Sequence, residues 1–332
     1  MRTLVVGPSW IGDAVLSQPL LARLKERDPS GSIDVLAPPW VLPVYSRMPE
    51  AAQTLALPFG HGELRLAERR RFAKGLAAYD RAVVLPNTLK SALVPWHAGI
   101  PVRTGYRGEM RYGLLNDLRA LDPAALALIV ERYAALAQPR GEILERPVPE
   151  PRLSIDATRR AAALARLGLD ASKPVAAFAP GAEYGPAKRW PARHFAALAK
   201  MLAARGDSVW LLGSTKDAPV TAEIQALSGG ACVDLAGKTT VDEAIDLLSL
   251  ASRVVSNDSG LMHVAAALDR PMAALFGSSS PEFTPPLSKK ARVITLRLSC
   301  SPCFARECPL GHLNCLVQLE PARALEALEG IE

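Results

Sequence analysis

Several residues that can do chemistry follow short apolar runs of the chain, and the first of them is Asp13. It ends the loop Gly7–Asp13, which has the spacing G-x-x-x-x-G but lacks the Lys and the Ser or Thr that complete a nucleotide phosphate loop. The glycines do not fit the dinucleotide pattern G-x-G-x-x-G either. A carboxylate after a buried strand can act as a general base. It can equally cap a helix that begins at Ala14, and the sequence alone leaves both interpretations open.

A second loop, PGAEYGPAKRWP, combines glycine with positive charge. Gly181 permits close approach of a ligand to the backbone, and Lys188 and Arg189 stand just before a predicted helix whose first turn suits Pro191. Lys and Arg side chains form strong, charge-assisted hydrogen bonds to phosphate. The combination favours a phosphate-binding loop over a solvated pair of charges.

A third loop, SNDSGLMH, joins a strand to a helix at residues 256–263. Backbone N–H groups at the start of that helix can bind a diphosphate, and His263 lies one turn further on. The structural alternative is that Asp258 or Ser259 only caps the helix and that His263 is an ordinary core residue. Asp217, in the loop GSTKD after another strand, supplies a carboxylate suited to the hydroxyls of a ribose.

Four of the five cysteines are crowded into one short segment near the C-terminus, at Cys300, Cys303, Cys308 and Cys315, with His312 among them. Thiolates at such spacings can bind zinc or an iron–sulfur cluster. However, the last two cysteines do not form a second C-x-x-C pair, so the zinc-ribbon pattern is incomplete. Reduced structural thiols or an adventitious disulfide explain the segment better than a metal does.

Two basic clusters lie in the N-terminal half. A solvated helix face is the ordinary explanation, and the alternative is a surface that receives a phosphorylated or carboxylated acceptor at a membrane. The clusters comprise Arg65, Arg69, Arg70, Arg71 and Lys74, and then Arg103, Arg107, Arg111 and Arg119.

The elements that must position these loops alternate between short apolar strands and amphipathic helices, which predicts an α/β fold with parallel sheets. A proline in the first helix, Pro19, should bend or delimit its first turn. The strands are expected near 3–7, 33–37, 82–86, 175–179, 208–212, 253–256, 272–276 and 292–296, and the helices near 14–27, 192–205, 218–227, 241–251 and 261–268.

The chain of 332 residues is long enough for two domains. The segment at 138–152 contains four prolines, so we place the boundary at 150, with domains at 1–150 and 151–315 facing across a cleft and a terminal helix within 316–332. A net charge of +6 with 5% aromatic residues is too weak a signal for a nucleic-acid partner. The start lacks a signal-peptide pattern and no apolar stretch is long enough to span a bilayer, so we expect a cytoplasmic protein.

Taken together, these segments resemble the ADP-heptose:lipopolysaccharide heptosyltransferases of glycosyltransferase family 9. The resemblance covers nearly the whole chain. Within the family, three segments are more similar to the heptosyltransferase II branch than to the heptosyltransferase I branch: the cysteine-rich segment, GSTKD and ERYAALA. The motifs that carry the resemblance are WIGDAVLSQPLL, PGAEYGPAKRWP, SNDSGLMHVAAAL and CSPCFARECPLGHLNC.

The resemblance implies a GT-B fold of two Rossmann-like domains, with the acceptor bound by the N-terminal domain and the sugar nucleotide by the C-terminal one. It implies that the terminal helix crosses back to the N-terminal domain. Asp13 matches the base for the acceptor hydroxyl, and Lys188 matches the lysine that meets the donor phosphates. The implied donor site comprises Gly181, Lys188, Asp217, Thr239, Asp258, Ser259, Gly260 and His263. The candidate acceptor residues are Gly12, Arg65, Arg69 and Arg107.

The implied reaction is direct displacement with inversion, from ADP-heptose to a heptose on Kdo₂-lipid A, with no essential metal and with peripheral contact to the inner membrane. In the matching loop, Ser259 stands where some relatives have threonine, and Asp217 where the heptosyltransferase I branch has glutamate. Three alternatives remain: a heptosyltransferase I or another family 9 enzyme with a different acceptor, a non-catalytic sugar-nucleotide-binding module, and a zinc-dependent nucleic-acid binder. An acid at Asp13 argues against the binding module, because ADP binding does not need it.

Overall fold

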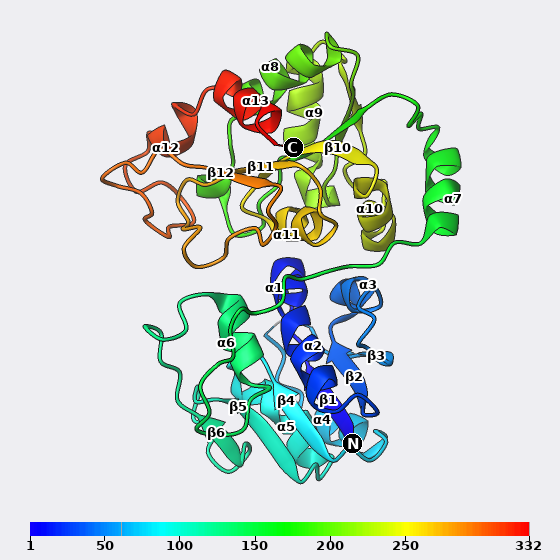
Figure 1. Cartoon of the computed structure of the whole chain (residues 1–332), viewed down its shortest axis with the longest axis vertical. Helices are drawn as coiled ribbons and strands as arrows, with labels where there is room; N and C mark the ends of the chain where they lie inside the picture. The colour runs from blue at the N-terminus through cyan, green and yellow to red at the C-terminus, as the bar shows by residue number, and fades with distance from the viewer. Residues whose placement is uncertain (61, 332) are drawn as a thin grey trace. The chain divides into compact units, whose positions relative to one another are not determined.

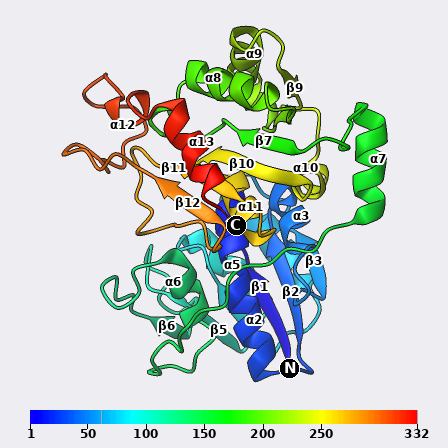
Figure 2. The ribbon, with the colours of Figure 1, turned by 45° about the horizontal axis from the view of Figure 1, so that its top comes forward.

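The computed structural model describes residues 1–60 and 62–331, which form two compact units, Met1–Pro151 and Arg152–Glu332. The division lies one residue beyond the boundary that the prolines indicated. Figure 1 shows a sheet with helices packed on it in each unit, and Figure 2 gives a second view of both. The two units are described in turn.

The N-terminal unit is built on six parallel strands in the order β3-β2-β1-β4-β5-β6. Its central strand, β1, has the buried run Leu4–Val6, as expected for a parallel sheet covered on both faces. Three of the six strands, β3, β5 and β6, were not predicted, because their short sequences mix polar and apolar residues. The strands are β1 (Arg2–Val6), β2 (Ser32–Ala37), β3 (Gln53–Ala56), β4 (Arg81–Val84), β5 (Val102–Tyr106) and β6 (Asp117–Arg119).

Helices pack on this sheet in two groups, α1 with α2, α3 and α6, and α4 with α5. The single helix expected at 14–27 is two helices that meet at Ser17. Pro19 lies in the first turn of the second, where its missing N–H costs no hydrogen bond. The helices are α1 (Ile11–Leu16), α2 (Gln18–Arg27), α3 (Leu42–Tyr45), α4 (Leu66–Lys74), α5 (Leu89–His97) and α6 (Ile129–Ala135), with a 3₁₀ turn η1 (Pro39–Val41).

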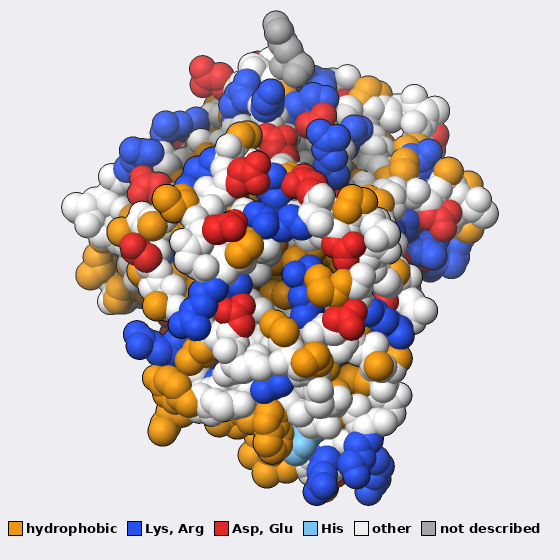
Figure 3. Space-filling view, turned by 60° about the horizontal axis from the view of Figure 1, so that its bottom comes forward, with side chains coloured by type: hydrophobic (Ala, Val, Ile, Leu, Met, Phe, Trp, Pro, Cys, Tyr) orange, Lys and Arg blue, Asp and Glu red, His pale blue; other side chains and the backbone are white. Residues whose placement is uncertain are grey.

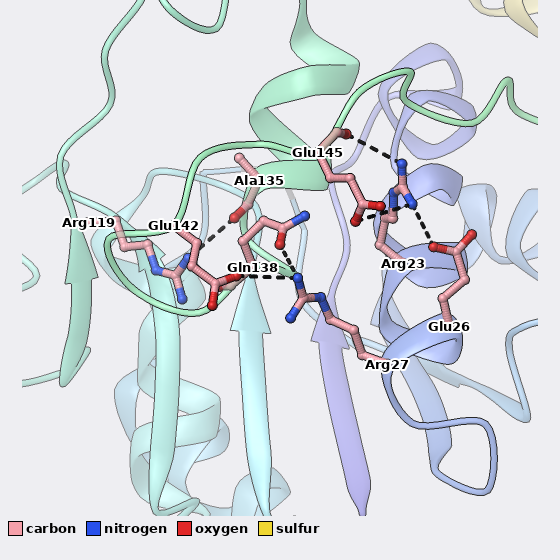
Figure 4. Close-up of polar contacts among 8 residues, drawn as sticks. All are labelled: Arg23, Glu26, Arg27, Arg119, Ala135, Gln138, Glu142 and Glu145. Carbon is pink, nitrogen blue, oxygen red and sulfur yellow. Dashed lines mark hydrogen bonds and ion pairs between the residues drawn. The ribbon is translucent and has the colours of Figure 1, made fainter.

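The proline-rich segment that ends this unit is fixed to α2 by two arginines (Figure 4). Arg23 donates to the carbonyl of Glu145 at 3.3 Å, as Figure 4 shows. It also donates to the carbonyl of Pro147 at 2.8 Å. Arg27 donates to the side chains of Gln138 and Glu142. Arginine therefore orders a stretch that has no regular secondary structure.

Replacing Arg23 by methionine is expected to lower the free energy of unfolding by about 1–3 kcal/mol, because the side chain is only 11% exposed and two carbonyls lose their donor. Urea denaturation of the whole chain measures this change. The matched control is Arg70→Met, since Arg70 is exposed on α4. Equal stability of the two variants would contradict the anchoring role.

The C-terminal unit has a second six-stranded parallel sheet, in the order β12-β11-β10-β7-β8-β9. Its central strand β7 is buried along its whole length and coincides with the predicted range. The strands are β7 (Val175–Ala179), β8 (Ser208–Leu211), β9 (Cys232–Asp234), β10 (Ala251–Asn257), β11 (Met272–Leu275) and β12 (Ala291–Ile294).

Helices again pack in two groups, α8 with α9 and α13, and α10 with α7 and α11. The four helices predicted in this half are all present, with ends that differ from the expected ones by at most three residues. The helices are α7 (Ala157–Leu167), α8 (Ala192–Ala203), α9 (Ala218–Leu227), α10 (Val241–Leu248), α11 (Gly260–Ala267), α12 (Asn314–Val317) and α13 (Pro321–Glu329), with 3₁₀ turns η2 (Pro186–Lys188) and η3 (Thr215–Asp217).

That the terminal helix α13 crosses back to the N-terminal domain, as the resemblance implied, stays a prediction. Within the second unit, α13 packs on α8, β11 and β12. The cause is its apolar face, since Ala324, Leu325 and Leu328 belong to the core that also contains Phe195. The last residue of the expected range lies outside the described residues. Within the described part of the chain, no helix has the length and apolar character to cross a membrane.

Candidate active site

The predicted donor residues gather at one edge of the second sheet. They follow the carboxyl ends of β7, β8, β9 and β10, four strands that are neighbours in the sheet order. Ligands of open parallel sheets bind at this edge. The structure thus brings together loops that are up to 80 residues apart in sequence. They hold Gly181 and Lys188 after β7, Asp217 after β8, Thr239 after β9, and Asp258, Ser259, Gly260 and His263 after β10.

Lys188 and Asp258 form an ion pair in this group. Lys188 Nζ lies 2.5 Å from Asp258 Oδ2, and the side chains are 18% and 6% exposed. Both residues were predicted, but their pairing was not. Because a nearly buried carboxylate needs a cation, Asp258 holds the lysine ammonium at a fixed place beside the start of α11.

A buried asparagine fixes the loop that carries Lys188. Asn257, at the end of β10, accepts from the backbone N–H of Trp190 at 3.1 Å and donates to the carbonyl of Pro180 at 2.7 Å. The two ends of the loop are therefore tied to the strand that leads to Asp258. Sequence analysis missed Asn257, although it stands inside the quoted loop SNDSGLMH.

Ser259 occupies the N-cap position of α11, but its side chain makes no capping hydrogen bond to the described backbone of that helix. Its hydroxyl instead lies 3.2 Å from that of Ser256. Simple helix capping therefore does not explain this serine. The first backbone N–H groups of α11 form a suitable site for an anion.

His263 is buried, 5% exposed, one turn into α11. Burial, with a further contribution from the positive charge of Lys188, lowers its pKa from 6.5 to about 4, against the opposite effect of Asp258. Within the part of the chain that the structure describes, its Nδ1 has no hydrogen-bond partner. His263 is therefore a neutral imidazole at physiological pH, and its role in the donor site stays a prediction.

The low pKa of His263 predicts a loss of stability in acid. Above pH 6.5 the histidine is neutral in both states, whereas between pH 6.5 and 4 only the unfolded chain takes up the proton. Stability therefore falls as the pH falls through this window, by about 3 kcal/mol in total from this residue. Urea denaturation at several pH values should show a shallower dependence for His263→Asn. An unchanged slope in His263→Asn would contradict the assignment.

Asp217 and Gly181 lie against each other. Asp217 Oδ2 accepts from the backbone N–H and the hydroxyl of Ser214, at 2.9 and 2.8 Å. A Cβ at position 181 would clash with the same carboxylate, so a larger residue there would displace Asp217. The carboxylate predicted to bind ribose thus also closes the turn η3. Thr239 is half-buried beside Thr240, which caps α10 through Glu243.

In the N-terminal unit, Asp13 is the third residue of α1, and Trp10 occupies the N-cap position. The helix begins at Ile11, so the interpretation of Asp13 as the cap of a helix starting at Ala14 is wrong. Burial, together with the negative charge of Asp13, raises the pKa of Tyr45 and Tyr133, which stay neutral hydroxyls beside the carboxylate. This arrangement at the carboxyl end of β1 can accept a proton. Tyr133 was missed as a neighbour, although it lies in the segment ERYAALA.

Half of the arginines in the two basic clusters bind backbone carbonyls inside the unit. Arg69 is 2% exposed and donates to the carbonyls of Leu64 and Glu63, so it has a structural role, and its contact with the acceptor stays a prediction. Arg65 and Arg107, by contrast, are exposed. The remaining inward-facing arginines are Arg103, Arg111 and Arg119, which donate to the carbonyls of Leu114, Pro86 and Gln138, respectively.

The cysteine-rich segment encloses a cavity of about 20 Å³. Its lining includes Cys300, Cys303, Cys308 and Cys315, all free thiols, together with His312. Hydrogen bonds from backbone N–H groups, that of Leu313 above all, lower the pKa of the Cys308 thiol. Among the described residues, no three side chains of the metal-binding types are arranged to hold an ion. That the protein needs no metal stays a prediction.

Comparison with known proteins decides the family. Residues 69–314 match the family model described as "Glycosyltransferase family 9 (heptosyltransferase)". The chain is also 48% identical to the lipopolysaccharide heptosyltransferase 2 of Escherichia coli (strain K12), in an alignment that covers 100% of this chain and 98% of the relative. The chain belongs to glycosyltransferase family 9. The sequence-based assignment to this family is confirmed, and with it the assignment as an enzyme.

Solved structures agree with the family 9 assignment. The structure of the E. coli ADP-heptose lps heptosyltransferase II is 46% identical, covers 99% of this chain and 98% of its own, and superimposes with a TM-score of 0.90. An E. coli heptosyltransferase solved with ADP is 22% identical with a TM-score of 0.72, which supports the fold. This family 9 glycosyltransferase has the predicted GT-B fold, with two Rossmann-like units that each contain a six-stranded parallel sheet.

Proposed function

We propose that this family 9 enzyme transfers heptose from ADP-L-glycero-D-manno-heptose to the first heptose of the lipopolysaccharide inner core, on Hep-Kdo₂-lipid A. The observation that carries the proposal is the 48% identity, over the whole chain, to a lipopolysaccharide heptosyltransferase 2. The lipopolysaccharide heptosyltransferase 1 of Pseudomonas aeruginosa matches over the same length at only 28%. This difference favours an acceptor that already carries one heptose.

The C-terminal unit binds the donor in this proposal. When the bond between the heptose anomeric carbon and the β-phosphate oxygen breaks, the electron pair leaves with ADP. Lys188 and the backbone N–H groups at the start of α11 would stabilise the charge that develops on that phosphate. Support comes from the ion pair that fixes Lys188 and from the uncapped start of α11. Preorganised donors of this kind contribute a few kcal/mol to transition-state stabilisation.

The N-terminal unit binds the acceptor. Asp13 would remove the proton from the acceptor hydroxyl as its oxygen bonds to the anomeric carbon, which inverts the configuration there. The half-buried carboxylate at the carboxyl end of β1, beside two neutral tyrosines, supports this role. Gly12 would allow the acceptor close to the backbone. The exposed Arg65 and Arg107 would bind its anionic groups.

Peripheral contact with the inner membrane, at its cytoplasmic face, completes the proposal. Arg70, Arg71 and Lys74 are exposed on α4, and Leu66 and Trp96 are large apolar side chains, 51% and 44% exposed, on α4 and α5. Figure 3 shows Lys and Arg side chains gathered next to apolar ones at the lower edge of one face. Basic and apolar side chains on one surface suit an anionic lipid bilayer.

Cosedimentation with vesicles of anionic phospholipid tests this contact. Changing Arg70, Arg71 and Lys74 together to glutamine is expected to weaken binding by roughly 1 kcal/mol per residue, and added salt should weaken wild-type binding. Neutral phosphatidylcholine vesicles provide the control. Equal binding of the wild type and the triple variant to anionic vesicles would contradict the proposed surface.

Acceptor-dependent release of ADP from ADP-heptose tests the proposed reaction. The wild type is expected to release ADP rapidly when Hep-Kdo₂-lipid A is present and slowly without it. Tight binding of ADP with no release under either condition would favour the non-catalytic binding module. A salt-dependent affinity for nucleic acid, together with bound zinc, would instead favour the nucleic-acid binder.

A further inference from the structure

The cysteine-rich segment packs directly on the loop that carries Lys188. The backbone N–H of Ala187 donates to the carbonyl of Arg306 at 3.0 Å, and the Tyr184 hydroxyl donates to the carbonyl of Phe304 at 2.8 Å. Gly185 lies so close to the backbone of Arg306 that a Cβ there would clash with it. Two segments about 120 residues apart in sequence are therefore fixed together next to Lys188.

Two cations share the ring of Tyr184. Lys188 Nζ lies 5.1 Å and Arg306 Cζ 5.2 Å from the ring centre. These distances suit cation–π interactions, which hold the two side chains beside the ring. Since both cations lie beside the same ring, Arg306 stands near the lysine assigned to the donor phosphates.

Among the cations named here around the loop that carries Lys188, Arg306 is the one whose charged group is not held by an ion pair or hydrogen bond among the described residues. Lys188 is paired with Asp258, and Lys216 with Glu183. Arg189 is half-buried and donates to a carbonyl of its own loop. Arg306 is exposed, and among residues 1–60 and 62–331 its guanidinium makes no ion pair or hydrogen bond. A nucleotide sugar has one negative charge on each of its two phosphates. Because Lys188 and Asp258 together are neutral, these phosphate charges need a further cation.

We infer that Arg306 binds the diphosphate of the sugar nucleotide and that Tyr184 is the positioning residue that aims it there. The cysteine-rich segment thus supplies a donor-binding arginine. This inference rests on the proposed function, since it deepens the description of the same donor site. A planar guanidinium forms two parallel hydrogen bonds with phosphate oxygens, which a lysine ammonium does not.

Calorimetric titration of the whole protein with ADP, AMP and adenosine tests the inference without any acceptor. In Arg306→Gln, the affinity for ADP is expected to fall roughly 10- to 100-fold, as for loss of a charge-assisted hydrogen bond, whereas adenosine affinity stays unchanged. AMP should be affected less than ADP. Arg306→Lys should recover part of the loss, and Tyr184→Leu should weaken ADP binding in the same direction. The matched control is Arg297→Gln, an exposed arginine of the neighbouring segment without an ion pair among the described residues.

Unchanged ADP affinity in Arg306→Gln would overturn the inference. So would an equal loss for ADP and adenosine, since that result indicates a disturbed loop. A wild type that does not bind ADP would overturn the proposed donor and the inference together. If Arg306→Gln weakens ADP binding while the wild type transfers no heptose, the inference stands and the proposed transfer fails.

Discussion

Asp13→Asn is expected to lower kcat by about 10²–10⁴-fold while the affinity for ADP stays unchanged. Asparagine keeps the size of the side chain but cannot accept the acceptor proton at neutral pH. The donor residues all lie in the C-terminal unit, so their geometry should not depend on this change. Steady-state rates of ADP release, with saturating donor and acceptor, measure kcat, and calorimetry measures ADP binding.

Asp80→Asn is the matched control for Asp13. Asp80 directly precedes β4, at the opposite end of the sheet, where it accepts a hydrogen bond from the backbone of Arg2. This variant should keep the wild-type kcat. Full activity of Asp13→Asn would leave the enzyme class intact but would exclude the proposed base.

Lys188→Met has the second large expected effect. Loss of the ammonium should lower kcat/KM by about 10²–10³-fold, which is typical when one donor to a developing negative charge is removed. ADP affinity should also fall, because Lys188 is the cation held at the start of α11. Lys216→Met is the control, since Lys216 is 71% exposed in its ion pair with Glu183. A comparable loss in the control would contradict the assignment.

The same substitution should also destabilise the protein, by about 3 kcal/mol, because the Asp258 carboxylate is left nearly buried without its cation. The double variant Lys188→Met/Asp258→Asn removes the charge as well as its partner, so it should regain most of the stability but not the activity. Thermal unfolding and kcat/KM together separate the two effects. Recovery of activity in the double variant would show that Lys188 acts only through folding.

The central strands and the donor loops could be predicted because their signal is local. The run Val175–Ala179 is apolar throughout, and glycines and polar residues directly follow it. The carboxyl ends of parallel strands lie at one edge, so listing the loops after each strand already indicated the donor site. The ADP-heptose donor itself came from the resemblance and not from spacing.

The missed features depend on contacts between distant segments. Tyr184 and Phe304 are 120 residues apart, and no local pattern predicts their hydrogen bond. Arg69 and Arg111 read as surface charges in the sequence, but their guanidinium groups bind backbone carbonyls in the interior. The packing of the terminal helix on the core around α8 was also missed, because its apolar face indicates burial without indicating the partner.

Mass spectrometry of the acceptor after incubation with ADP-heptose tests the central claim most directly. The account predicts that Hep-Kdo₂-lipid A gains the mass of one heptose, and that Kdo₂-lipid A without a heptose is unchanged under the same conditions. A gain of one heptose on Kdo₂-lipid A alone would contradict the proposed acceptor and assign the chain to the reaction of the other branch of the family. No gain on either acceptor, with folded protein that binds ADP, would contradict the proposed transfer itself.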